Sequence, residues 1–147
     1  MYNVRDIADK RTKIHTSHSS TRPLSKDYDY IGVAGEVAFA KEFGLKVDVA
    51  VKPGGDKGID FILPIGTVDV KCYRKPYNLL REVGKIHADI LVLAGFDNAS
   101  KEAYLIVWEY DNEMINCLTK DFGYGIVNHY KAAGKLKTIP ELHKRCQ

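Results

Sequence analysis

The chain has little cysteine and no hydrophobic run long enough to cross a membrane. Three cysteines occur among its 147 residues, at the irregularly spaced positions 72, 117 and 146. An odd number of cysteines, none at the spacing of a zinc site, favours free thiols in a reducing compartment over a disulfide framework. No apolar stretch approaches the ~18 residues of a membrane span, and the first residues lack the apolar segment of a secretory signal. We therefore expect an intracellular, cytoplasmic protein with no membrane partner.

The composition is that of a globular domain whose charge is unevenly distributed. A chain of this length predicts a single domain over residues 1–147, and 45% hydrophobic with 28% charged residues is ordinary. Residues 1–26 carry six Lys/Arg and two acids, and residues 128–147 carry five and one. The centre is left with 11 basic and 16 acidic residues. Basic ends around an acidic centre suit a protein that grips phosphates and concentrates carboxylates, with solvated termini as the alternative.

The hydrophobic pattern predicts an α/β protein whose elements follow the order α-β-β-β-α-β-β. We expect helices over residues 30–43 and 78–87, and strands over 47–51, 59–63, 67–72, 89–94 and 103–108. Gly44 is well placed to end the first helix, and the wholly apolar segment 89–94 is typical of a strand buried on both faces. Residues 1–29 are expected to form a basic N-terminal arm that is loop-like to residue 26. Residues 121–147 are expected to form a loose basic C-terminal segment, with a last turn after Pro140.

Two carboxylates and a lysine are concentrated between residues 60 and 71. Asp69 and Lys71 are two residues apart on an expected strand, so they project from the same face. We expect a two-residue turn at Ile65 and Gly66. That turn places Asp60 opposite Lys71 and diagonal to Asp69, about 7–8 Å away at the backbone. A hard cation with oxygen ligands at about 2.1 Å can bridge two such side chains, so the segment predicts a divalent-metal site.

The other face of this hairpin is apolar, which supports the expected register. Its residues are Ile59, Phe61, Leu63, Val68 and Val70. A polar face on the same hairpin requires either solvent or a function to explain it. At average composition an acid-x-Lys triplet is expected about once in a chain of this length. A solvent-exposed ion pair between Asp69 and Lys71 is therefore the alternative to a functional site.

A glutamate in the first expected helix adds a third carboxylate. Glu36 lies in the small-residue segment Gly-Val-Ala-Gly-Glu-Val-Ala-Phe, residues 32–39. With Asp60 and the Asp-Val-Lys triplet at 69–71, it makes the chain resemble the PD-(D/E)XK nuclease superfamily, in its restriction-endonuclease-like and resolvase-like branches. The resemblance covers about residues 30–108. It implies a restriction-endonuclease-like αβββαβ core, with a mixed central sheet flanked by helices.

Each motif of that superfamily has a counterpart in this sequence. Asp60 corresponds to the aspartate of the second strand, residues 69–71 to the (D/E)-x-K motif of the third, and Glu36 to the glutamate often found on the first helix. The glycine-rich run from residue 54 to 58 resembles the segment that precedes the metal-binding aspartate. The chain departs from the motif at Ile59, which stands where proline is usual, and at Asp69, where glutamate is more common.

The resemblance implies metal-assisted hydrolysis of DNA phosphodiester bonds. Asp60 and Asp69 would bind one or two Mg²⁺ or Mn²⁺ ions, and the backbone carbonyl of Val70 would complete the shell. Glu36 would ligate the metal directly or through water. Such a metal lowers the pKa of its bound water and neutralises charge that develops on the phosphate. Lys71 would orient or help deprotonate that water and stabilise the transition state.

The implied partner is DNA, and the chain is too small for a separate sequence-reading domain. We expect an endonuclease that acts on branched or otherwise structured DNA, similar to a Holliday junction resolvase, and a homodimer because cutting two strands requires two sites. The residues expected to contact DNA phosphates are Tyr73, Arg74, Lys75, Arg11, Lys13 and Arg22. For residues 73–75 an ordinary polar strand end is the alternative. The alternative functions are a non-catalytic nucleic-acid-binding module on the same fold and a structural or assembly protein.

Overall fold

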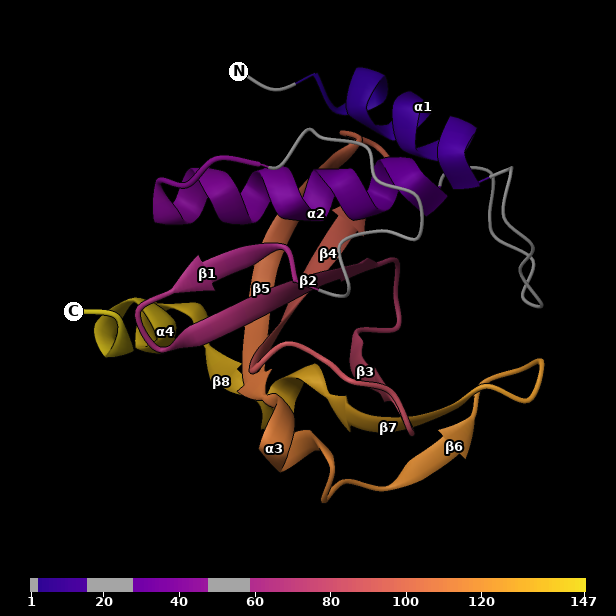
Figure 1. The fold of residues 1–147 in the computed structure, drawn as a ribbon, viewed down its shortest axis with the longest axis vertical. Coiled ribbons are helices and arrows are strands. Elements are labelled where there is room, and N and C mark those ends of the chain that lie inside the picture. The colour runs from indigo at the N-terminus through magenta and orange to yellow at the C-terminus, as the bar shows by residue number, and fades with distance from the viewer. Residues whose placement is uncertain (1–2, 16–27, 48–58) are drawn as a thin grey trace.

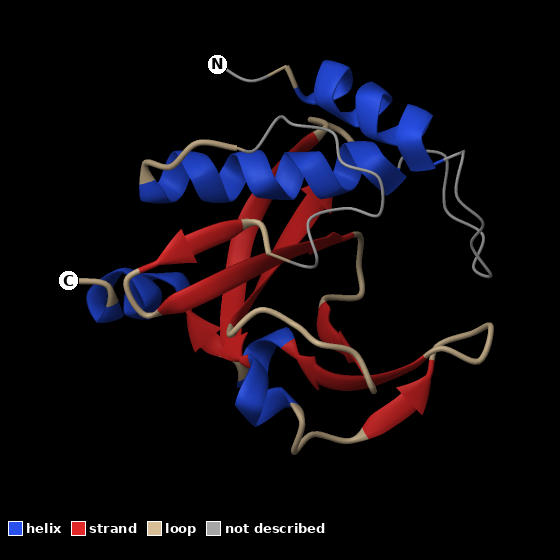
Figure 2. Cartoon of the chain, viewed as in Figure 1, coloured by secondary structure: helices blue, strands red, loops and turns tan. Residues whose placement is uncertain are grey.

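The computed structural model describes residues 3–15, 28–47 and 59–147. These residues form a mixed α/β structure with two sheets (Figures 1 and 2). The elements are α1 Val4–His15, α2 Tyr28–Phe43, β1 Phe61–Leu63, β2 Gly66–Tyr73, β3 Asn78–Glu82, β4 Ile90–Asp97, β5 Glu102–Tyr110, α3 Asp111–Met114, β6 Thr119–Asp121, β7 Val127–Ala132, the 3₁₀ helix η1 Ala133–Lys135, β8 Lys137–Thr138 and α4 Ile139–Arg145.

The large sheet is mixed and has the strand order β1-β2-β4-β5-β8. β2 and β4 run parallel, whereas the other three neighbouring pairs are antiparallel. β4 lies at the centre, and its residues 90–96 are all buried. This confirms the prediction of a strand buried on both faces, since its Ile, Leu and Val side chains have no solvent-facing side. The three strands of the small sheet are antiparallel, in the order β3-β7-β6.

The two faces of the large sheet are covered by different elements. α2 lies across one face, with α1 packed on its outer side, whereas the small sheet lies on the opposite side of the molecule (Figure 1). The core on the α2 face contains Val68 and Val70 of β2, together with Ile139 and Leu142 of α4. The core on the other face joins Leu79 of the small sheet to Leu91 and Leu93 of β4. We call these the helix face and the open face of the large sheet.

Gly35 brings α2 into backbone contact with β2 on the helix face. A Cβ atom at Gly35 would lie 2.7 Å from the Cβ of Cys72 and 3.4 Å from Cγ1 of Val70. Because real Cβ atoms do not approach this closely, the helix–strand spacing depends on the missing side chain. Cys72 is enclosed by the same contact, and this burial raises the pKa of its thiol to about 12. Cys72 is therefore a packing residue and not a reactive thiol.

The predictions for the central part of the chain are largely confirmed. The helix predicted over 30–43 is α2, and it ends at Gly44, whose φ of +65° suits glycine after a helix. The strands predicted over 67–72, 89–94 and 103–108 are β2, β4 and β5. β1 is shorter than the predicted strand 59–63, because it begins at Phe61. Ile59 lies before β1 and is 39% exposed.

The prediction of a loop over residues 1–26 is wrong for residues 4–15, which form α1. The side chain of Asn3 caps this helix, because its Oδ1 accepts a hydrogen bond of 3.1 Å from the backbone N–H of Asp6. Ile7 and Ala8 are buried and belong to the core of the helix face. Val4 also packs against this core. These few apolar contacts give a pattern too sparse to read as helical periodicity.

Two further predictions fail because they concern strands whose partners are distant in sequence. Residues 78–87 are not a helix: residues 78–82 form β3, which pairs with β7 from Asn78–Ala132 to Glu82–Asn128. The segment 121–147 is not loose, since it contains β7, η1, β8 and α4. The turn expected after Pro140 is part of α4, in which this proline occupies the first helical turn. The second helix of the expected αβββαβ order is therefore replaced by a strand of the small sheet.

Some predictions lie outside the described residues. These are the strand over 48–51, the loop over 16–26, the glycine-rich run at 54–58 and the position of Arg22.

Candidate functional site

The hairpin between β1 and β2 turns one residue earlier than its sequence suggests. Leu63 pairs with Gly66, so Pro64 and Ile65 form the turn in place of Ile65 and Gly66. The strand register shifts by two residues, because Phe61 lies opposite Val68. A shift of two leaves every side chain on its original face. The predicted pairing of Asp60 with Lys71 is therefore wrong, whereas the predicted division into an apolar and a polar face of the hairpin is retained.

Asp89 fastens this turn to the start of β4. Its Oδ2 accepts hydrogen bonds from the backbone N–H of Thr67 at 3.0 Å and from the Thr67 hydroxyl at 3.1 Å. The Thr67 Oγ1 in turn accepts a bond of 3.0 Å from the backbone N–H of Asp89. Gly66 has a φ of +145°, and a Cβ there would lie 2.8 Å from the same carboxylate. The turn thus holds β2 against β4 and fixes the position of the residues that follow.

Asp60 is bound to β2 on both sides of Asp69. Its backbone N–H donates to the carbonyl of Val68 at 2.8 Å, and its Oδ2 accepts from the backbone N–H of Val70 at 2.8 Å. The carboxylate thus takes the place of a strand partner at the point where the β1–β2 ladder ends. In a β-strand the N–H and C=O of one residue point to the same side. The Val70 carbonyl therefore points toward the side occupied by Asp60, as a shared metal shell requires.

Asp69 and Lys71 project together from the open face of the large sheet. Their partners in β4 are Leu91 and Leu93, which belong to the core of that face. The Lys71 Nζ lies 2.8 Å from Oδ2 of Asp69, and both side chains are largely buried, with 24% and 13% of their surface exposed. The pair is therefore less exposed than the solvated surface ion pair that is the alternative to a functional site. Holding two charges in partial burial costs desolvation energy, so their retention at one spot needs a reason.

Glu36 approaches the same strand from the helix face. It follows Gly35, which contacts Val70 and Cys72, and only 6% of its surface is exposed. Asp69 and Glu36 thus belong to opposite faces of β2. The Asp60 carboxylate and the Val70 backbone lie at the edge of the sheet, where the β1–β2 ladder ends.

The oxygen donors at this edge suit Mg²⁺ or Mn²⁺. Mg²⁺ is commonly held by one or two carboxylates, with the remaining positions filled by water and substrate phosphate. Asp60, Asp69 and the Val70 carbonyl are such a set. Within residues 3–15, 28–47 and 59–147, no group of three or more His, Cys, Asp or Glu side chains is arranged to hold a metal ion. The fit therefore rests on two carboxylates and a backbone oxygen, and Glu36 is at most an outer participant in the geometry described.

The residues expected to contact DNA occupy several environments. Tyr73 ends β2 on the open face and packs against the core there. The Arg74 Nε donates to Oδ1 of Asn98 at 2.6 Å, and its guanidinium lies 5.5 Å from the Phe96 ring centroid. Lys75 is exposed. Arg11 and Lys13 lie within α1, and Arg22 lies outside the described residues.

Sequence patterns gave no sign of two tyrosines that share the open face with Asp69 and Lys71. Tyr104 of β5 lies opposite Gly95 of β4, which lies opposite Tyr73 of β2. Tyr77, in the connection between β2 and β3, places its hydroxyl oxygen 2.5 Å from that of Tyr104. These residues are separated by up to 31 positions in the chain, so only the strand pairing brings them together.

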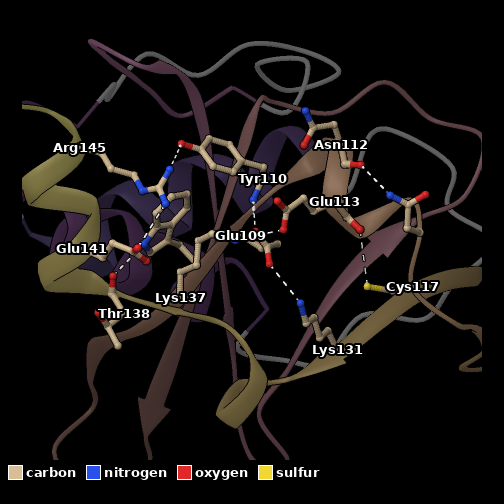
Figure 3. A network of polar contacts seen from close by, with 12 residues as sticks. Glu109, Tyr110, Asn112, Glu113, Cys117, Lys131, Lys137, Thr138, Glu141 and Arg145 are labelled. Carbon is tan, nitrogen blue, oxygen red and sulfur yellow. Dashed lines mark hydrogen bonds and ion pairs between the residues drawn. The ribbon is translucent and has the colours of Figure 1, made fainter.

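A second group of charges, also missed from sequence, surrounds Glu109 (Figure 3). This glutamate of β5 is 1% exposed and accepts hydrogen bonds from Lys137 at 2.5 Å, from the backbone N–H of Tyr110 at 2.9 Å and from Lys131 at 3.2 Å. Burial alone would raise the pKa of Glu109, but these bonds lower it below its ordinary value. Both carboxylate oxygens accept hydrogen bonds, so Glu109 joins β5 to β7 and β8.

Comparisons of this chain with protein-family models, with curated proteins and with solved structures give no match. In the part of the chain that the structure describes, no helix is long and apolar enough to cross a membrane.

Proposed function

We propose that the protein is a Mg²⁺- or Mn²⁺-dependent deoxyribonuclease of the PD-(D/E)XK type, with a restriction-endonuclease-like core. The observation that carries the proposal is the pair of 2.8 Å hydrogen bonds by which Asp60 holds the backbone on both sides of Asp69. These bonds bring the Asp60 carboxylate to the Val70 backbone, which directly follows Asp69 in the chain. Lys71 lies beside them on the same face as Asp69.

Each residue of the site has a separate part in the proposed hydrolysis. Asp60, Asp69 and the Val70 carbonyl would hold the metal, which when bound supplies an acidified water and neutralises phosphate charge. The Lys71 ammonium contacts the Asp69 carboxylate at 2.8 Å. From there it would donate hydrogen bonds to the attacking water and to a phosphate oxygen. Glu36 would orient the shell from the helix face.

The proposed substrate is branched or otherwise structured DNA, cut by an endonucleolytic, resolvase-like enzyme that acts as a homodimer in the cytoplasm. Two observations support contact with DNA: basic residues concentrate at both ends of the chain, and the exposed Lys75 follows the strand that carries Asp69. Two cuts on opposite strands need two copies of the site, and a two-fold dimer provides them.

The test is cleavage of labelled linear, flapped and four-way DNA with Mg²⁺ or Mn²⁺. Asp69→Asn and Lys71→Met are expected to abolish cleavage while DNA binding survives. Glu102→Gln and Lys135→Met, which change exposed residues of the same charge type, serve as matched controls and are expected to cleave normally. Full activity of purified Asp69→Asn or Lys71→Met protein would refute the assignment.

Metal titration separates the nuclease from a non-catalytic DNA-binding module. Calorimetry should detect Mn²⁺ binding that Asp60→Asn and Asp69→Asn weaken. Lys71→Met removes the ammonium that occupies Asp69, so this variant is expected to bind Mn²⁺ more tightly than the wild type while it fails to cleave. Salt-sensitive DNA binding with no Mn²⁺ binding and no cleavage would instead favour the binding module.

A further inference from the structure

Three tyrosines follow the catalytic residues along the open face of the large sheet. Asp69, Lys71 and Tyr73 alternate with the buried residues of β2, so all three point to this face. Tyr73 lies opposite Gly95 of β4, which lies opposite Tyr104 of β5. Tyr73 therefore lies two residues beyond Lys71 on the same face of β2, about 6.6 Å farther along the strand.

Gly95 makes room for the Tyr104 ring to lie across β4. A Cβ at Gly95 would be 2.8 Å from Cζ of Tyr104 and 2.9 Å from its hydroxyl oxygen. The ring therefore leans from β5 over the centre of the sheet, toward Tyr73 of β2. A larger residue at position 95 would force it away from the face.

Tyr77 holds the Tyr104 ring in this position. The two hydroxyl oxygens are 2.5 Å apart, and the rings meet edge to face with centroids 6.2 Å apart. The hydrogen bond that Tyr104 shares with Tyr77 raises the pKa of Tyr104 to about 12, so its phenol is neutral at physiological pH. Despite these contacts, 45% of the Tyr104 surface is exposed. An aromatic ring that is oriented by its neighbours and still open to solvent is suited to bind a planar ligand.

We infer that this tyrosine cluster, Tyr73, Tyr77 and Tyr104, stacks an unpaired base of the DNA strand next to the phosphate held at Asp69 and Lys71. Bases stack on aromatic side chains whatever their identity, because every base has a π-face. A base inside a continuous duplex is already stacked between its neighbours and cannot reach the cluster. The cluster therefore selects a substrate with single-stranded character beside the cut, such as a branch or flap. This inference rests on the proposed function for the position of the phosphate.

The test is fluorescence of 2-aminopurine placed in a short single-stranded branch of a DNA duplex, measured with Ca²⁺ so that binding is followed without cleavage. Wild-type protein is expected to quench the branch base and to bind the branched DNA more tightly than a blunt duplex. Tyr104→Ala should remove the quenching and weaken branched-DNA binding by about 5- to 150-fold, the range of one base–aromatic stack, with blunt-duplex binding unchanged. Tyr104→Phe should behave as the wild type, because stacking needs the ring and not the hydroxyl.

The matched control is Tyr124→Ala, which removes a tyrosine that is 68% exposed in the connection between β6 and β7. It is expected to leave both affinities unchanged. Gly95→Ala provides a second route to the same result, since its Cβ displaces the Tyr104 ring without deleting it. Equal affinity of Tyr104→Ala and wild type for branched DNA, or an equal loss on branched and blunt DNA, would overturn the inference.

Cleavage assays with Mg²⁺ show which of the two proposals fails. If cleavage depends on Asp69 but Tyr104→Ala quenches the branch base and binds branched DNA as the wild type does, the stacking inference alone is overturned. Tyr104-dependent quenching without any cleavage would support the stacking inference and refute the nuclease.

Discussion

Substitution of Gly35 by alanine tests whether the spacing between α2 and β2 depends on a missing side chain. The added Cβ would lie 2.7 Å from the Cβ of Cys72, an atom that is fixed to the backbone of β2 and cannot rotate away. The helix must therefore move outward. Overpacking of this kind costs about 1–3 kcal/mol.

Gly32→Ala is the matched control, because Gly32 lies in the same helix and a Cβ there meets nothing within 4 Å. Both substitutions gain the same helix propensity, about 0.8–1.0 kcal/mol for glycine to alanine. Gly32→Ala is therefore expected to raise the free energy of unfolding by up to about 1 kcal/mol. The free energy of unfolding of Gly35→Ala should be about 1–3 kcal/mol lower than that of Gly32→Ala, because only Gly35→Ala overpacks the interface.

Urea unfolding, followed by circular dichroism, measures both variants. The midpoints should separate while the slope m stays constant, since the surface exposed on unfolding is unchanged. Cys72→Gly in the Gly35→Ala background removes the opposing Cβ. In a double-mutant cycle, the double variant should therefore lose less stability than the sum of the two single substitutions. Equal stability of the Gly35→Ala and Gly32→Ala proteins would show that α2 is not held at backbone contact with β2.

Three further predictions concern other contacts. Glu109→Gln should lower the free energy of unfolding by about 1.5–3 kcal/mol at pH 7. Because the pKa of Glu109 is lowered, its contribution is present above the ordinary value of 4.5 and is lost as the pH falls through the folded-state pKa; a gap between variant and wild type that does not narrow at all as the pH is lowered below 4.5 contradicts this reasoning. Thr67→Val keeps the shape but loses both hydroxyl bonds to Asp89, at a cost of about 1–2 kcal/mol in urea unfolding. With a thiol pKa of about 12, Cys72 should resist iodoacetamide at pH 8 until the protein is denatured, as mass spectrometry can show; rapid labelling in the native state would place the thiol outside the buried contact.

The faces of β2 could be predicted from its sequence even though its turn could not. Alternation along 68–71 assigns Asp69 and Lys71 to one side and Val68 and Val70 to the other, whatever the loop does. The actual turn shifts the register by two residues, which leaves these sides unchanged. What the pattern could not supply is the hydrogen bond of Asp60 to the Val70 N–H, because that depends on β1 ending at Phe61.

Two of the errors in the fold share one physical cause. Residues 78–82 contain leucine, arginine and glutamate, which favour a helix locally, but they form a strand because β7 pairs with them across about 50 residues. The segment that contains β7 looked loose for the same reason, since neither strand is recognisable without the other. Helix α1 was missed for a different reason: the Asn3 cap and two buried apolar residues give only a weak helical signal in the sequence.

The shortness of β1 connects the fold to the proposed chemistry. The ladder between β1 and β2 ends at Phe61 and Val68, and the Asp60 carboxylate binds the next outward-facing N–H of β2, that of Val70. If β1 began two residues earlier, its backbone would pair with Val70 and use the carbonyl that the proposed metal needs. Replacing a strand partner by a carboxylate leaves that carbonyl on the same side as Asp60, while Asp89 holds the other end of the hairpin. The proposed site therefore depends on an interrupted strand, because the late start of the β1 ladder leaves the Val70 N–H to the Asp60 carboxylate.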